Sequence, residues 1–168
     1  MHWGSLRFCI YWMLLSGAAA VAQNPATITR VYVEDADGRV HVVSRAGKDT
    51  VIPKEKDQVR CDSPKVAEDQ RTAGWLIDYE NCCTSYPIPL TLVIYRPGRI
   101  VQRIQPGWMI FDWRFVEGAK KIALSSGTVH GMTYRSLSLY DVGTGRLLDR
   151  WEGAFEQLPP LWARGLSQ

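Results

Sequence analysis

The chain has 168 residues, of which 46% are hydrophobic and 22% are charged, a composition typical of one folded globular domain. Disordered, collagen-like and coiled-coil chains are excluded by this composition. Twenty Lys and Arg residues against 17 Asp and Glu leave a net charge of +3, too small and too scattered to indicate a nucleic-acid-binding surface. We therefore expect no nucleic-acid partner.

Residues 1–22 have the layout of a secretory signal peptide. Arg7 precedes an apolar run at 8–15, and small residues follow up to Ala22. The apolar stretch is shorter than the roughly 20 residues that a membrane-spanning helix needs, so cleavage near Ala22 is favoured over a retained anchor. We expect an exported product, periplasmic or extracellular, that is soluble after cleavage and has no stable membrane insertion.

We expect an all-β domain over residues 23–153, and its first unit covers residues 27–53. Within that unit, residues 31–43 are typical of a β-hairpin, because two alternating runs flank a polar turn. Gly38 lies in the turn, where a tight hairpin needs a residue at positive φ.

A second unit, of four strands, is predicted over residues 58–107. Strands at 63–66 and 72–79 flank a polar turn, and residues 90–104 contain a further hairpin.

The connection before that hairpin contains Tyr86, Pro87, Ile88 and Pro89. Two prolines so close together exclude regular ladder pairing, so we expect an extended loop from Tyr86 to Pro89. This loop is our candidate for recognition of a partner, with Tyr86, Pro87 and Pro89 as its binding residues.

The cysteines of this unit predict a disulfide, since an exported protein is expected to oxidise one pair. Cys61 opens the first strand pair and the adjacent Cys82 and Cys83 close it, so antiparallel pairing predicts a bridge from Cys61 to Cys82 or Cys83. The sequence leaves open which of the two is bridged. No C-x-x-C or zinc-ligand spacing is present, so we expect no metal site.

A third unit is predicted over residues 108–153, with strands at 110–116 and 121–124 and a hairpin at 137–151. His130 lies in its glycine-flanked connection. Two interpretations stay open: His130 is a base or ligand acting with Asp112 or Asp141, or it is a structural histidine hydrogen-bonded to neighbouring strands.

Residues 154–168 are expected to cover an exposed sheet face. Leu158, Leu161 and Trp162 would supply the cover, while Pro159 and Pro160 prevent one continuous helix.

The hairpin at 90–104 recurs about 47 residues later at 137–151, with matching Leu, Gly and Arg positions. The segment SLSLYDVGTGRLLDRW resembles the outer hairpin of a WD-repeat-like propeller blade, and SPKVAEDQRTAGWLIDY resembles the inner strand pair of such a blade. The resemblance implies antiparallel four-stranded blade-like sheets. About two and a half blades are present, fewer than the four to eight of a closed propeller, so an open or partial propeller is expected.

Blade architecture carries no function by itself. We expect a non-catalytic binding or assembly module that recognises a protein or peptide through an open sheet edge or the Tyr86 to Pro89 loop. The alternatives are a periplasmic hydrolase or lyase that uses His130 with Asp112, and a carbohydrate-binding module that uses exposed aromatics. We expect no cofactor, and a homo-oligomer is one way in which the missing blades would be supplied.

Overall fold

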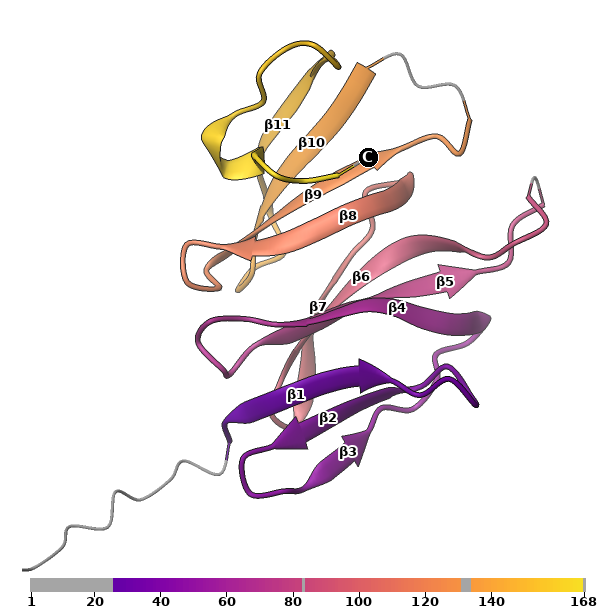
Figure 1. The fold of residues 1–168 in the computed structure, drawn as a ribbon, viewed down its shortest axis with the longest axis vertical. Helices are drawn as coiled ribbons and strands as arrows, with labels where there is room; N and C mark the ends of the chain where they lie inside the picture. Colours follow the sequence, from indigo (N-terminus) through magenta and orange to yellow (C-terminus); the bar gives the residue numbers. More distant parts are fainter. Residues whose placement is uncertain (1–25, 83, 131–133, 168) are drawn as a thin grey trace, which may run out of the picture.

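In the computed structural model, residues 26–167 apart from 83 and 131–133 are described, and they form eleven β-strands (Figure 1). The strands make three antiparallel sheets that stack in sequence order. The expected all-β class with an open arrangement of blade-like sheets is therefore confirmed. No helix in the described part of the chain is long and apolar enough to cross a membrane.

The three sheets follow one another along the chain. The first contains β1 (Ile28–Val33), β2 (Val40–Ser44) and β3 (Asp49–Val51). The middle sheet contains β4 (Gln58–Val66), β5 (Ala73–Tyr79), β6 (Ile88–Arg96) and β7 (Arg99–Ile104). The last sheet contains β8 (Met109–Val116), β9 (Lys121–Gly127), β10 (Tyr134–Asp141) and β11 (Leu147–Ala154). Each sheet is a meander in which successive strands pair.

The loop predicted from Tyr86 to Pro89 is shorter than expected, because Ile88 and Pro89 belong to β6. Pro89 lies opposite Asp78 at a register shift between β5 and β6. A bulge interrupts the regular ladder, so it accommodates a residue that has no N–H to donate. Two prolines nearby were thus insufficient evidence against a strand.

The middle sheet contributes to both hydrophobic cores. Trp75 and Ile77 of β5 pack toward the first sheet, whereas Leu76 packs toward Trp113 and the last sheet. Burial on both faces explains why β5 has a continuous apolar pattern in place of simple alternation.

Gly74 allows the close approach of the middle and last sheets. A Cβ atom at this position would lie 2.8 Å from Cη2 of Trp113 and 2.9 Å from the carbonyl oxygen of Val93. Since both neighbours are fixed in the core, no side chain fits between them.

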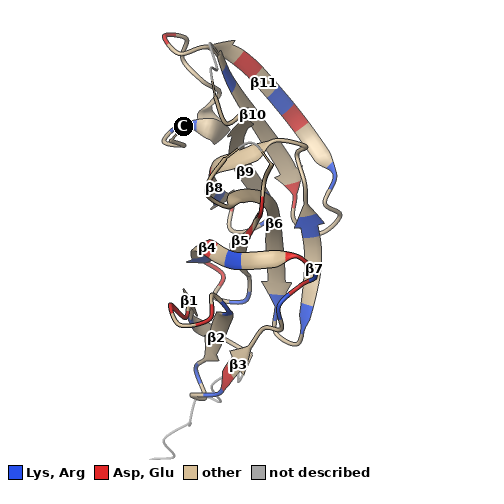
Figure 2. Cartoon of the chain, turned by 90° about the vertical axis from the view of Figure 1, so that its right-hand side faces the viewer, with Lys and Arg blue, Asp and Glu red and all other residues tan. Residues whose placement is uncertain are grey.

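The antiparallel meander divides the connections between two rims of the stack. Among the described residues, the loop rim consists of the connections 34–39, 52–57, 80–82, 84–87, 105–108, 128–130 and 155–160, with the strand ends beside them. The turn rim consists of the shorter connections 45–48, 67–72, 97–98, 117–120 and 142–146. Strands β1, β4 and β8 form one side edge of the stack, and β3, β7 and β11 form the other (Figure 2).

The C-terminal segment crosses the outer face of the last sheet (Figure 1). Ala163 is buried, and Trp162 Nε1 donates a hydrogen bond to Asp149 at 3.0 Å. Leu158 and Leu161, which were expected to supply the cover, are instead 83% and 74% exposed. Polar contacts and the small buried side chain of Ala163 therefore hold the segment in place, and both leucines face solvent.

The expected disulfide of Cys61 is not formed. Cys61 is a buried thiol in the middle of β4, opposite Ile77, and it belongs to the core between the first two sheets. Cys82 is exposed and lies beyond the end of β5, five positions after Ile77 in the sequence. At the rise of a strand, this spacing carries Cys82 well away from Cys61. Cys83 lies outside the described residues. Burial raises the pKa of the Cys61 thiol to about 12, so the group stays protonated in its apolar site.

Candidate binding rim

All four exposed aromatic side chains of the described residues lie on the loop rim. Tyr86 and Trp108 are 54% and 55% exposed, and Tyr134 and Phe155 are 48% and 47% exposed. The four come from separate connections or strand ends, and the antiparallel strand order brings these to one side of the molecule. Exposed aromatics gathered on one side mark an interaction surface.

The loop rim is also acidic. Its described connections carry seven carboxylates, namely Glu34, Asp35, Asp37, Glu55, Asp57, Glu80 and Glu156. They carry three cations, namely Arg39, Lys54 and Lys56. The backbone N–H and guanidinium of Arg39 lower the pKa of Asp37, so this carboxylate stays ionised. An aromatic surface of this charge favours partners that combine apolar and basic groups.

Two cavities open at the loop rim. One, of about 510 Å³, has Tyr79 and Leu90 as apolar walls and Asp57 and Glu80 as acidic ones. It lies where β5 ends and β6 begins, beside the loop that carries Tyr86. The other, of about 720 Å³, separates the 34–38 turn from β4 and is lined by further carboxylates.

His130 and Asp112 make no contact with each other. His130 is exposed, and its backbone carbonyl accepts a hydrogen bond from Thr128. The described residues supply no hydrogen bond to its imidazole, and a structural role through neighbouring strands stays a prediction. Asp141, the other partner considered for His130, lies at the turn rim, where it accepts hydrogen bonds from Thr144.

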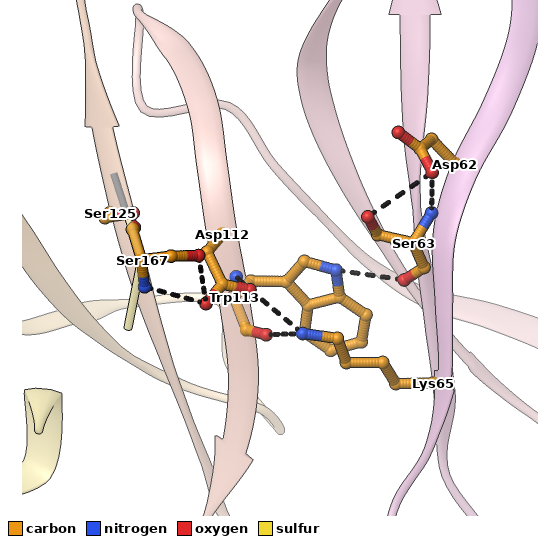
Figure 3. Close-up of polar contacts among 7 residues, drawn as sticks. All are labelled: Asp62, Ser63, Lys65, Asp112, Trp113, Ser125 and Ser167. Carbon is orange, nitrogen blue, oxygen red and sulfur yellow. Dashed lines mark hydrogen bonds and ion pairs between the residues drawn. The ribbon is translucent and has the colours of Figure 1, made fainter. Parts of the chain in front are cut away.

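Asp112 is fully engaged elsewhere (Figure 3). Its Oδ1 accepts from Lys65 Nζ at 3.0 Å and from the Trp113 N–H at 2.7 Å. Its Oδ2 accepts from the N–H and hydroxyl of Ser167 at 3.0 and 3.1 Å. Burial opposes ionisation, but these donors outweigh it and lower the pKa of Asp112. Four donors to one carboxylate indicate a structural tie between the middle sheet, the last sheet and the C-terminal segment.

The same cluster closes the edge of β8 against strand pairing. The Trp113 N–H donates to Asp112 and the Trp113 carbonyl accepts from Lys65, so both backbone groups at this edge position are occupied. On β4, the Cys61 N–H donates to Gly38 at 3.1 Å. The Ser63 carbonyl accepts from Trp113 Nε1 at 3.2 Å. Because their backbone groups are occupied by side chains and turns, these edges are poor templates for an added strand.

A buried carboxylate that the sequence did not single out is Asp78 on β5. It is 1% exposed and accepts a hydrogen bond from Arg60 Nε at 2.8 Å. Burial raises the pKa of Asp78, although Arg60 opposes that shift. Alternation along β5 does place Asp78 on the face of Leu76, but only the tertiary structure shows that this position is closed to solvent.

The described residues contain no group of three His, Cys, Asp or Glu side chains placed to hold a metal ion. No protein-family model matches the chain, and no curated protein is significantly similar to it.

Proposed function

We propose that the protein is an exported binding module, built from WD-repeat-like blades, that recognises a protein or peptide through the loop rim. The observation that carries the proposal is the gathering of all four exposed aromatics of the described chain on that one rim. Export rests on the signal-peptide pattern of residues 1–22.

The aromatics and carboxylates define the expected ligand. Tyr86 and Trp108 offer broad apolar surface with a polar edge, which suits peptide side chains and backbone. Asp57 and Glu80 line the cavity of about 510 Å³ and would attract Lys or Arg. The preferred ligand is therefore a peptide segment that combines apolar and basic residues.

A hydrolase built on His130 and Asp112 receives no support from the geometry. Among the described residues, the donors to Asp112 come from Lys65, Trp113 and Ser167, and these contacts leave the carboxylate no orienting role toward an imidazole.

Selection of a random peptide library on the purified protein tests the proposal. We expect enriched peptides rich in aromatic or aliphatic and basic residues. The double variant Tyr86→Ser, Trp108→Ser should weaken their binding at least about tenfold, since such anchors dominate binding free energy.

The matched control is Leu147→Ser, Leu148→Ser, which removes two exposed apolar side chains from the start of β11 at the turn rim. This control should bind the selected peptides as the unchanged protein does. Peptides that bind both double variants equally, or a selection that enriches nothing, would refute recognition through the loop rim.

A further inference from the structure

The side edge formed by β3, β7 and β11 contains one long strand whose backbone groups remain available for pairing with another strand. β3 has three residues, and β7 carries Arg99 and Arg103 with no carboxylate. β11 has eight residues and carries charges of both signs (Figure 2). Like charges discourage self-pairing of β7, whereas β11 has no such protection.

The hydrogen bonds at both ends of β11 show which of its backbone groups point outward. The N–H and carbonyl of Ala154 bond to Gln157, so they point away from β10. The pairing of β10 and β11 is uninterrupted from Asp149 to Ala154. Because orientation alternates along an antiparallel strand, Glu152 and Arg150 point outward like Ala154.

The turn between β10 and β11, at the other end of β11, gives the same alternation of inward and outward backbone groups. Asp141 donates its N–H to Arg146 and accepts from Gly145, so its backbone groups face β11. Leu139, two residues earlier on β10, therefore also faces β11 and pairs with Asp149. Asp149 then points inward and Arg150 outward. The described residues supply no partner to the outward backbone groups of Arg150 and Glu152.

We propose that β11 pairs antiparallel with β11 of a second copy of this chain, about a twofold axis at Trp151. In this register, each outward Arg150 lies opposite the outward Glu152 of the other copy. The backbone phase therefore allows four N–H to carbonyl hydrogen bonds across the axis. It also places an Arg–Glu ion pair on either side of Trp151, which faces its own symmetry mate.

The alternative registers are electrostatically worse. Centring the axis on Arg150 would set two guanidinium groups opposite each other, and centring it on Glu152 would oppose two carboxylates. An axis between Arg150 and Trp151 would oppose Asp149 to Glu152 and would pair an outward with an inward residue. The pairing of charges and the alternation of outward and inward backbone groups therefore both select the register with its axis at Trp151.

The two ends of the stack favour this edge over face-to-face stacking. The C-terminal segment covers the outer face of the last sheet. The outer face of the first sheet carries a polar cluster in which Tyr32 stacks on His41 at 4.9 Å and Asp49 bonds to both. Neither of these outer faces exposes an apolar surface that a further sheet would bury. The β11 edge is therefore the surface for a second copy.

Sedimentation equilibrium of the purified protein tests the proposal over concentrations from about 1 µM to 1 mM, the range expected for a small edge interface. We expect a reversible monomer–dimer equilibrium. Arg150→Glu and Glu152→Arg should each raise the dissociation constant at least about tenfold, because each change sets like charges opposite each other twice. Arg99→Glu on β7, which changes the net charge as Arg150→Glu does, should leave the dimer unchanged.

Mixing provides the test that is specific to the register. The Arg150→Glu chain has two acidic residues at these positions and the Glu152→Arg chain has two basic ones, so the two variants should form a heterodimer. The double variant Arg150→Glu, Glu152→Arg should dimerise like the unchanged protein. A protein that stays monomeric at 1 mM, or single variants that dimerise as well as the unchanged chain, would overturn the proposal; so would failure of the two variants to associate on mixing.

Discussion

Asp112 joins three separate parts of the chain through one carboxylate. Lys65 approaches from the middle sheet, Trp113 from the same strand and Ser167 from the C-terminal segment (Figure 3). The side chain is 22% exposed, so the hydrogen bonds are only partly screened by water. Its role is to hold elements together, and this role predicts a specific pH dependence.

Asp112→Asn should lower the free energy of unfolding at pH 7 by about 1–2 kcal/mol, the value of hydrogen bonds to a partly exposed charge. The pKa of Asp112 in the folded protein lies below its ordinary value of 3.8. Ionisation therefore stabilises the fold fully above pH 3.8, and this stabilisation is lost as the pH falls through the lowered pKa. The difference between the two proteins should shrink over the same range in urea denaturation.

The exposed turn residue Asp35 offers the control, since Asp35→Asn changes the net charge equally. This variant should follow the unchanged protein at each pH. A constant difference between Asp112→Asn and the unchanged protein from pH 7 to pH 3 would mean that the carboxylate charge contributes nothing.

At the scale of elements, the C-terminal segment completes the last sheet. Leu137 and Leu139 of β10 are buried although they lie on the outer face of the outermost sheet. Ser125 Oγ donates to the carbonyl of Ser167 at 2.7 Å, which holds the end of the segment over that face. The segment therefore acts as a cap for the stack of sheets.

Ala163→Glu should destabilise the protein by about 3 kcal/mol, because it places an unpaired charge where Ala163 is 1% exposed. Leu158→Glu, in the same segment, should change the free energy of unfolding by less than about 0.5 kcal/mol, since Leu158 is 83% exposed. Thermal or urea denaturation of the two variants measures both values. Equal effects would show that the segment is not docked as described.

At the scale of the whole molecule, the middle sheet is shared by two cores. Trp75 of β5 belongs to the core with the first sheet, and Leu76 beside it belongs to the core with the last sheet. Opening the middle sheet therefore disrupts both cores. Local unfolding of the first sheet leaves the core between the middle and last sheets intact. This arrangement predicts unequal local stability.

Native-state hydrogen exchange should be slowest for amides in β5 and β6, and at least about tenfold faster in β2 and β3. Mass spectrometry of peptides from β5 and from the first sheet measures the two rates under the same conditions. Equal protection throughout the chain would mean that the three sheets open only as one unit.

Several features follow from local sequence alone. Alternating runs and turn residues are sufficient for the hairpin around Gly98, because the pattern of a strand and the positive φ of its turn are local properties. The internal repeat extends this inference to the corresponding hairpin at 137–151. For the same reason, the strands on either side of the 117–120 turn were predictable to within a few residues.

Other features depend on the tertiary structure. The prediction of a disulfide from Cys61 was wrong. Spacing along the chain does not show that Cys61 faces a core, nor that Cys82 lies beyond the end of β5. Asp112 was predictable as a candidate but its partners were not, since Lys65 and Ser167 reach it only once the sheets stack. The loop rim likewise exists only because the strand order gathers Tyr86 and Trp108 from distant segments. Local sequence determined the strands, and packing between sheets decided which side chains meet.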